Sequence, residues 1–538
     1  MHDADNRRSR RSLVRDAVAS GATVAGASVL NIPDDADAAK KKNNKKKHGK
    51  KPNVVLFISD QERKVQHFPE GWAAEHLPAQ ERLRRNGVTF NNAFCSACQC
   101  SPSRASLFTG FFPAQHGVVD VQTFEFDPAS ANQPSLPLPE DLPNLATFMA
   151  EAGYDVVFKG KWHMSKPASW SEPGDPVEWE RSDVSPYGFR RWNAPDAGDQ
   201  AGPEHVGAGT ADNDGRYMNG TEDQQGVIDF IHSRIGKEKP FCLIVSLVNP
   251  HDITEFPGIG DQWIRDGFDD SWLASTGIGF PPNYVEDLAA NGKPNAQQAL
   301  PAQLDFYLGA FEDEDQKIDY LNFYGNLMKV IDGYIADTVR ALKAAGHYDN
   351  TLFIRTSDHG EMALSHGGLR QKTLQAYEET LRVPMVYSWP GHLPAGASSD
   401  ALVSHVDVLP TILGLVGAAA APARAEWQGN DYSTVVQHPE RSGPNDYVLF
   451  TYDDVYGGVP VPPYVGANHI VCYRDDRYKI VRYRDEEENP DPDEWEFYDL
   501  LSDPYEMTNI AFTDPNNALL TEYRDKLDAA IADRLQPR

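Results

Sequence analysis

The sequence predicts an α/β fold: a large, mostly parallel mixed sheet sandwiched by helices, followed by a smaller C-terminal antiparallel subdomain. Three observations support this prediction. Apolar runs of strand length alternate with amphipathic stretches through most of the chain, as in sheets buried on both faces. The C-terminal part instead alternates apolar and polar residues, which is typical of antiparallel strands. With 538 residues, 40% of them hydrophobic, the chain can bury a large core.

Four apolar runs of strand length lie at residues 54–58, 155–158, 241–248 and 352–356. Their continuous apolar character indicates buried parallel strands. Each run leads into polar or titratable residues: Ser-Asp-Gln at 59–61, Lys-Gly-Lys-Trp-His at 159–163, Asn-Pro-His-Asp at 249–252 and Ser-Asp-His-Gly at 357–360. Ligands bind beyond the carboxyl ends of parallel strands, so the sequence predicts a metal-dependent active site at this edge. Taken singly, each of these residues has an alternative place in a helix cap or a loop.

Helical stretches separate these strands. Apolar residues recur every three or four positions in residues 143–152, 226–235 and 321–345. A further strand is predicted at 383–389 and a short helix at 404–417. Strands that alternate with helices predict a sheet covered by helices on both faces.

The C-terminal part of the chain has a different pattern. Residues 447–450, 468–473 and 478–483 are predicted antiparallel strands, and residues 516–535 are a predicted terminal helix. We therefore expect a catalytic domain at residues 52–428 and a C-terminal antiparallel subdomain at residues 429–538.

The N-terminal residues have the pattern of an export signal. Residues 9–15, Ser-Arg-Arg-Ser-Leu-Val-Arg, resemble the twin-arginine motif, and a mildly apolar stretch with a small-residue cleavage site follows. Residues 1–39 are predicted to be a twin-arginine signal peptide, and the lysine-rich residues 40–51 a solvated linker. This predicts an exported protein that is periplasmic, cell-wall-associated or extracellular. A basic tail without a targeting role is the alternative.

Charge and cysteine content exclude several kinds of partner and site. The formal net charge is −29, and the remainder of the chain is more acidic still because residues 1–51 are basic. Such a protein repels nucleic acid, so no nucleic-acid partner is expected. Five cysteines make no disulfide framework at this length. The Cys-x-x-Cys-x-Cys cluster at 95–100 lacks the second pair that zinc sites usually have.

A polar stretch that begins at Cys100, Cys-Ser-Pro-Ser-Arg-Ala-Ser-Leu-Phe-Thr-Gly, is predicted to open a short helix. Ser101 is a candidate cap, Pro102 suits the first helical position and Gly110 suits the far end. Cys100 then precedes a helix N-terminus, where backbone N–H groups favour anions. Arg104, about one turn later, adds a guanidinium fork for a tetrahedral oxyanion.

This stretch resembles the signature of the type I sulfatases of the alkaline phosphatase superfamily, Cys-x-Pro-Ser-Arg followed by Leu/Phe-Thr-Gly. Further motifs of this chain are similar to those of the family: Gly-Lys-Trp-His at 160–163, Pro-His at 250–251, Asp-His-Gly at 358–360, Lys372, and Glu-Glu-Thr-Leu-Arg-Val-Pro at 378–384. The matches extend from about residue 52 to residue 511. The resemblance implies the fold of that family and hydrolysis of a sulfate monoester.

The resemblance also implies cofactors, partners and site residues. It implies formylglycine derived from Cys100 and a divalent cation, with Ca²⁺ favoured over Mn²⁺ or Mg²⁺. The implied partners are a small-molecule or saccharide sulfate ester, a formylglycine-generating enzyme and the twin-arginine export machinery. The implied metal ligands are Asp60, Gln61, Asp358 and His359, and the implied catalytic residues are Cys100, Arg104, Lys161, His163, His251 and Lys372.

Each catalytic residue has an implied role. Arg104 bridges the nucleophile and the metal site. Lys161 and Lys372 neutralise negative charge on the transferring group. His251, with Lys372, protonates the leaving oxygen, and His163 orients the formylglycine hydroxyls.

Two alternatives to a sulfatase remain open. Most sulfatases have Asp-Asp at the first metal pair, whereas Asp60-Gln61 resembles the phosphonate monoester hydrolases of the same superfamily. The first alternative is therefore a phosphonate monoesterase or phosphodiesterase acting at the same site. The second is a non-catalytic extracellular binding protein in which Cys100 stays a thiol.

Two long stretches, residues 164–220 and 252–317, have few predicted strands and are rich in Pro, Gly, Asp, Trp and Tyr. Stretches of this length in a compact domain are usually functional or disordered. Four of their tryptophans are predicted either to stack on a sugar or aryl group of the substrate or to pack on the surface: Trp170, Trp179, Trp192 and Trp263.

Overall fold

The part of the chain that the computed structural model describes comprises residues 50–122, 136–170, 177–197, 213–258, 270–418, 427–453, 469–484 and 493–538. The predicted signal peptide, most of the predicted linker and Trp263 lie outside it. Residues Lys50–Arg538 form one compact unit. Among the described residues, no helix has the length and apolar character needed to cross a membrane.

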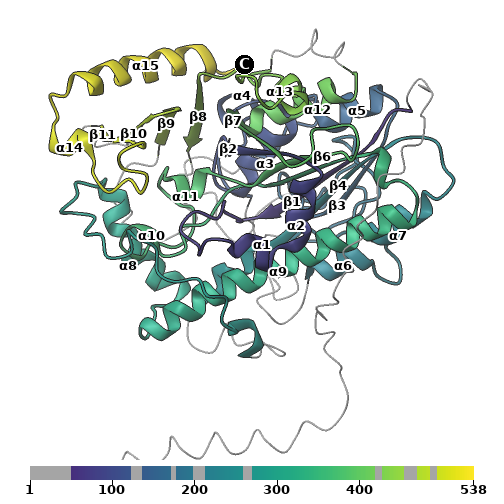
Figure 1. The fold of residues 1–538 in the computed structure, drawn as a ribbon, viewed down its shortest axis with the longest axis horizontal. Coiled ribbons are helices and arrows are strands. Elements are labelled where there is room, and N and C mark those ends of the chain that lie inside the picture. The colour runs from purple at the N-terminus through teal and green to yellow at the C-terminus, as the bar shows by residue number, and fades with distance from the viewer. Residues whose placement is uncertain are drawn as a thin grey trace, which may run out of the picture. The chain divides into compact units, whose positions relative to one another are not determined.

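A seven-stranded mixed sheet lies at the centre of this unit (Figure 1). Its order is β3 (Asp155–Gly160), β4 (Phe241–Pro250), β1 (Asn53–Asp60), β5 (Thr351–Ser357), β6 (Met385–Ser388), β2 (Gly87–Phe94) and β7 (Ala397–Ser404). β6 is antiparallel to both of its neighbours, and the other pairs are parallel. The predicted mostly parallel mixed sheet is confirmed, and the four predicted apolar strands are consecutive within it.

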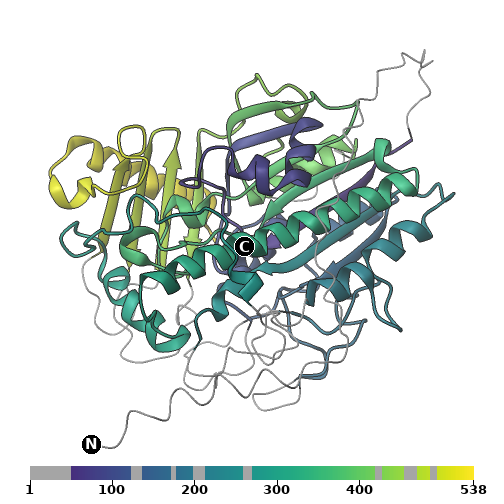
Figure 2. The same cartoon turned by 60° about the horizontal axis from the view of Figure 1, so that its bottom comes forward.

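Helices cover both faces of this sheet, as predicted. Successive residues of β1 point to opposite faces, so Phe57 and Leu56 belong to different core clusters. The Phe57 face packs against α7 (Val227–Ser233) and α9 (Glu314–Ala344), and Figure 2 shows α9 running along the strands. The Leu56 face packs against α3 (Cys100–Thr109), α5 (Leu145–Glu151) and α12 (Val408–Leu415).

Two strands of the sheet, β2 and β7, have no counterpart among the sequence-based predictions. β7 has the sequence Ala-Ser-Ser-Asp-Ala-Leu-Val-Ser and lies at the edge of the sheet. Its polar first half faces solvent in part, so it lacks the continuous apolar run that identified the central strands.

Shorter helices and turns fill the connections between these elements. The α-helices are α1 (Trp72–His76), α2 (Pro78–Arg85), α4 (Pro113–His116), α6 (Asn213–Asn219), α8 (Asn295–Leu308), α10 (Ser365–Gly368), α11 (Glu378–Leu381), α13 (Ser433–Gln437) and α14 (Ile510–Thr513). The 3₁₀ turns are η1 (His251–Glu255), η2 (Asp270–Leu273), η3 (Tyr348–Asn350) and η4 (His405–Asp407).

The predicted C-terminal antiparallel subdomain is confirmed, and its sheet has four strands, one more than the three that were predicted. Its order is β11 (Glu494–Asp499), β10 (Tyr478–Arg484), β9 (His469–Asp475) and β8 (Tyr447–Tyr452), and α15 (Ala518–Arg534) packs on it (Figure 1). Residues of β8 and β9 also belong to the core cluster that holds α3. Thr451 N donates to Ser96 O at 3.0 Å, so this sheet touches the segment that leads into α3.

Buried charges join the C-terminal sheet to α11. Lys479 of β10 is fully buried; its Nζ forms an ion pair with Glu506, lies 3.5 Å from Glu378 Oε1 and donates to Ala376 O at 2.8 Å. Glu506 Oε2 accepts from Glu378 N at 2.8 Å. One ammonium therefore serves two buried carboxylates from different parts of the chain.

We predict that Lys479→Met lowers the free energy of unfolding by about 3–5 kcal/mol, because it removes the ammonium that pairs with the buried carboxylate of Glu506. Burial raises the pKa of Glu506 to about 7, above its ordinary 4.5. A carboxyl group whose pKa is higher in the folded than in the unfolded state makes the protein less stable as the pH rises between those two values. Without Lys479 the pKa of Glu506 should rise further. The difference in unfolding free energy between the variant and the wild type should therefore grow from pH 5 to pH 8, as measured by denaturant unfolding.

The matched control is Arg477→Ala, which removes an ion pair with Asp499 in which the arginine side chain is 52% exposed. Exposed pairs contribute little to stability, so this variant should unfold like the wild type. Equal losses in the two variants would contradict the importance of burial at Lys479.

Candidate active site

The carboxyl ends of the four central parallel strands meet at one edge of the sheet, and each end supplies a site residue. β1 ends at Asp60, and Asp358 follows β5 directly. Lys161 follows β3, and His251 follows β4 as the first residue of η1. These four side chains are at most 5% exposed. The structure therefore brings the predicted strand-end residues to a common buried edge.

Four potential metal ligands lie together at this edge: Asp60, Cys100, Asp358 and His359. One ligand atom from each lies within 4.8 Å of the others, and all four residues are buried. Cys100 Sγ is 3.2 Å from His359 Nε2 and 3.6 Å from Asp60 Oδ1. The residue predicted to become the nucleophile is thus in contact with two predicted metal ligands.

α3 begins at Cys100 itself, with Gln99 at the N-cap position. The prediction that Ser101 caps this helix is wrong, because its hydroxyl accepts a hydrogen bond from Gln122 N at 3.0 Å. Pro102 accordingly lies at the third helical position and not the first. The start of α3 lies at the cluster, where the helix dipole favours negative charge.

Arg104 ties this helix to the sheet. Its Nη2 and Nε lie 2.9 Å from Asp60 Oδ2 and Asp358 Oδ2, respectively. Its Nη1 donates to Lys161 O at 3.0 Å and to Ser246 Oγ at 2.6 Å. One buried guanidinium therefore holds the ends of β1, β3, β4 and β5 in fixed relation to Cys100.

Neighbouring charges shift the pKa values of the two aspartates in opposite directions. Burial opposes ionisation of Asp60, but Lys161, 2.5 Å away, and Arg104 hold its pKa well below the ordinary value. Burial and the neighbouring Asp60 raise the pKa of Asp358. The carboxylates of Asp60 and Asp358 have oxygens within 4.8 Å of each other and repel. A divalent cation between them would relieve this repulsion.

The donor set fits a divalent cation. Gln61 lies beside Asp358, because its backbone N donates to Asp358 Oδ1 at 3.0 Å. His359 Nδ1 lies 3.0 Å from Gly360 O, which leaves Nε2 on the side of the cluster. Two carboxylates, an amide oxygen and an imidazole nitrogen are compatible with Ca²⁺, Mg²⁺ or Mn²⁺.

The remaining predicted residues surround this cluster. Lys372 Nζ donates to Gln61 Oε1 at 2.5 Å, and His163 Nε2 lies 3.0 Å from Gln122 O. Among the described residues, Nδ1 of His163 and Nδ1 of His251 have no hydrogen-bond partner although both are buried. Burial and the nearby Lys161 hold the pKa of both histidines well below the ordinary value. Buried polar atoms without partners are typical of a site that binds a ligand.

Two family models together match nearly all of the chain after its N-terminal segment. Residues 52–418 match the sulfatase family model, and residues 367–533 match the model of the N-sulphoglucosamine sulphohydrolase C-terminal region. The chain belongs to the sulfatase family. It is an enzyme of the alkaline phosphatase superfamily and hydrolyses sulfate esters. This supports an enzyme over the non-catalytic binding protein that the sequence left open.

The relatives of this sulfatase are distant but similar along most of their length. An N-acetylglucosamine-6-O-sulfatase of Bacteroides thetaiotaomicron is 23% identical over 525 residues, covering 87% of this chain and 84% of its own. A 2-O GAG sulfatase structure has a TM-score of 0.66 and 23% identity, with 90% and 92% coverage. A phosphonate monoester hydrolase of Agrobacterium radiobacter has a TM-score of 0.61 and 22% identity, with 90% and 96% coverage. Both structures support the fold.

Two aspartates that were not predicted from the sequence hold the loops that follow β3 and the end of β4 in the candidate site. Asp196 accepts hydrogen bonds from Trp162 N and His163 N, each at 2.7 Å. Asp214 accepts from Val248 N at 2.7 Å and Asn249 N at 3.0 Å, just before His251. Neither aspartate belongs to a motif, because any acidic residue at the right place could accept from these backbone groups. Nothing in the sequence distinguishes them from the other acidic residues of their loop.

The backbone is strained at two residues of the sulfatase site and at Gln371, which precedes Lys372. Gln61, His163 and Gln371 have φ values of 65°, 53° and 70°, in the left-handed region that non-glycine residues rarely adopt. Such conformations cost on the order of 1–3 kcal/mol each and persist where surrounding contacts fix them. Their concentration at this edge indicates that side-chain placement there is maintained against local preference.

The tryptophans predicted as substrate-stacking candidates lie in different environments. Trp192 is buried: its indole donates to Gly160 O at 2.8 Å and its ring packs against Trp179. It therefore supports the turn that carries Lys161 and does not stack on substrate. Trp170 lies under Lys166, whose Nζ is 4.0 Å from the ring centroid.

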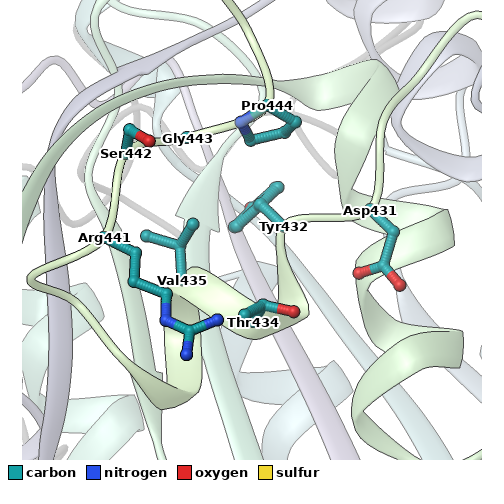
Figure 3. A pocket seen from close by; sticks show the side chains of 8 residues that line it. All are labelled: Asp431, Tyr432, Thr434, Val435, Arg441, Ser442, Gly443 and Pro444. Atoms are coloured by element: carbon teal, nitrogen blue, oxygen red, sulfur yellow. The ribbon is translucent and has the colours of Figure 1, made fainter.

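A surface hollow of about 490 Å³ lies elsewhere on the sulfatase, around α13 (Figure 3). Its lining residues are Asp431, Tyr432, Thr434, Val435, Arg441, Ser442, Gly443 and Pro444. None of them belongs to the cluster around Cys100, so the candidate active site is identified by its chemistry and not by this hollow.

We predict that Asp196→Ala lowers kcat/KM for a sulfate ester by on the order of 100-fold, because the turn that carries Lys161 and His163 loses its anchor. The variant also leaves buried N–H groups unpaired, at a cost of about 1–3 kcal/mol in stability. Activity should therefore be measured on folded protein below its Tm.

Asp183→Ala is the matched control. Asp183 accepts from Glu180 N at 2.8 Å in the same loop but contacts no site residue among those described. Its activity should stay close to the wild-type value even if its Tm falls. The anchoring role of Asp196 would be contradicted if both variants lost activity to the same degree.

Proposed function

We propose that this sulfatase cleaves the sulfate monoester of a saccharide or another small molecule, with oxidised Cys100 as nucleophile and a divalent cation beside it. The contact of Cys100 with His359 and Asp60, inside a buried cluster of ligand atoms, is the observation that supports this most directly.

Two groups would complete the chemistry of the site. Formylglycine at position 100 would supply the hydroxyl that attacks sulfur. A cation held by Asp60, Gln61, Asp358 and His359 would polarise the sulfuryl oxygens, and Ca²⁺ is favoured by the oxygen-rich donor set.

The chain's own cations would stabilise the transferring group. Lys161 and Lys372 flank the cluster, at 2.5 Å from Asp60 and Gln61 oxygens, respectively. Hydrogen-bond donors that are already in place before the reaction need not rearrange during it. Removing one such donor costs on the order of 2.7–4 kcal/mol of transition-state stabilisation in comparable sites. Arg104 is committed to Asp60 and Asp358, so it would position the cluster.

The two buried histidines would handle protons. His251 follows the end of β4, where burial, Lys161 and Lys372 depress its pKa. The negative charge of a bound sulfate ester would raise that pKa again, and the protonated imidazole would then donate its proton to the leaving oxygen. His163 has a free Nδ1 among the described residues and a second nitrogen held at Gln122 O, so it would orient the attacking hydroxyl.

A second candidate function is phosphonate monoester or phosphodiester hydrolysis at the same site. Gln61 favours it, since a neutral amide replaces a carboxylate at the first metal pair. The structural similarity to a phosphonate monoester hydrolase is consistent with either activity.

The substrate class and cellular route belong to the same proposal. The relative that acts on N-acetylglucosamine 6-O-sulfate supports a saccharide sulfate. The twin-arginine-like residues 9–15 support export and the corresponding machinery as a partner, and the Cys100 motif supports a formylglycine-generating enzyme.

We predict that the peptide containing Cys100, from protein made in its native host, is about 18 Da lighter than the thiol form. The same preparation should hydrolyse an aryl sulfate faster than the matched aryl phosphonate, and Cys100→Ala should remove the activity. Mass spectrometry and paired turnover assays test this. Faster phosphonate turnover would favour the second candidate, and an active preparation that contains only thiol would exclude the formylglycine mechanism.

We predict that His251→Ala slows hydrolysis of an alkyl sulfate by about 10²–10⁴-fold, the range expected for loss of a general acid. An aryl sulfate with a nitrophenolate leaving group should lose far less, because that group departs without a proton. Steady-state kinetics over a series of leaving groups measures the difference. His232→Ala, on the exposed side of α7, is the control, and equal losses for both esters would argue against the acid role.

A further inference from the structure

Glu361 lies directly behind Gln61, in the loop that follows β5. It is fully buried. Its carboxylate is the acceptor in each of its hydrogen bonds to the described residues. Oε2 accepts from Gln61 Nε2 at 2.6 Å. Oε1 accepts from Tyr320 Oη at 2.7 Å, Gln371 N at 2.8 Å and Ala363 N at 3.1 Å. Both oxygens of the carboxylate are therefore fixed by hydrogen bonds, and an ionised carboxylate can only accept a hydrogen bond from Gln61.

These contacts leave one orientation for the Gln61 amide. Nε2 donates to Glu361 and also lies 3.2 Å from Gln371 Oε1, while Oε1 accepts from Lys372 Nζ at 2.5 Å. A reversed amide would place its oxygen against the Glu361 carboxylate and its N–H groups against the ammonium of Lys372. Both contacts would be repulsive, so Oε1 points toward the lysine and away from Glu361.

The backbone of Gln61 is fixed as firmly as its side chain. Its N donates to Asp358 Oδ1 at 3.0 Å, and its O accepts from Tyr324 Oη at 2.7 Å. Its φ of 65° lies in the left-handed region, which these contacts maintain. Neither the main chain nor the amide can therefore turn without breaking hydrogen bonds.

We propose that Glu361 is a positioning residue for the metal site: it fixes the Gln61 amide with Nε2 on its own side and with Oε1 facing away from it, available as a ligand oxygen, and it makes position 61 selective for an amide over a carboxylate. A carboxylate at position 61 would place an oxygen about 2.6 Å from that of Glu361, where two negative charges repel strongly. The cluster accordingly has two carboxylates and a neutral ligand. This inference rests on the proposed function, because it takes Gln61 as a metal ligand.

The test exchanges the charges of the pair. Ca²⁺ and Mn²⁺ are titrated calorimetrically into metal-free full-length protein carrying Glu361→Gln, Gln61→Glu or both changes. In the wild-type background, Glu361→Gln should weaken cation binding by about 10–100-fold, the usual effect of losing an outer-shell partner. In the Gln61→Glu background the same change should strengthen binding, because the amide introduced at position 361 can donate to the new carboxylate.

This reversal of sign distinguishes positioning from simple structural support. A role in folding alone would make Glu361→Gln harmful in both backgrounds. Tyr320→Phe is the matched control, since it removes a donor from Glu361 Oε1 and leaves the Oε2 contact with Gln61. It should change cation affinity far less than Glu361→Gln does.

The remaining outcomes are also decisive. The Tm of each metal-free variant reports folding separately, and Glu361→Asp, which withdraws the charge by one methylene, repeats the sign test if Glu361→Gln does not fold. Weaker binding in both backgrounds would overturn this inference while leaving the proposed function intact. A wild-type protein that binds neither cation would overturn both.

Discussion

The buried guanidinium of Arg104 is the contact on which the rest of the site depends. It lies between Asp60 and Asp358 and also contacts Lys161 O and Ser246 Oγ. These groups come from four parallel strands, while Arg104 itself belongs to the helix that begins at Cys100. An unpaired charge in this core would be very costly, so the helix, the strand ends and the reactive residue must assemble together.

The surrounding hydrogen bonds make the site rigid before any ligand arrives. Asp196 and Asp214 bind the backbone of two strand-end turns, and Glu361 binds the amide of Gln61. Gln61, His163 and the neighbouring Gln371 have left-handed backbone conformations, which these contacts stabilise. Preorganised donors and charges of this kind lower a reaction barrier because little rearrangement remains for the reaction itself.

Much of this arrangement could be predicted from the sequence, and there are physical reasons why the remainder could not. Continuous apolar runs identified β1, β3, β4 and β5, and parallel strands must share an edge, so Asp60, Lys161 and Asp358 could be placed together. Polar edge strands such as β7 carry no comparable signal. Asp196 and Glu361 act on backbone or amide groups brought close only by the fold, and such pairs have no sequence spacing. The cap at α3 was misplaced because Ser101 instead binds the distant Gln122 N.

The burial of Cys100 has a consequence for how the enzyme is made. Its side chain is 2% exposed, and every residue of its helix is buried. Under the proposed function, the enzyme that oxidises this thiol must reach it before the helix docks on the sheet. Oxidation at Cys100 would then take place during biosynthesis. A molecule that folded with the thiol intact would keep it, so one preparation would contain active and inactive molecules of identical sequence, in a ratio fixed before folding was complete.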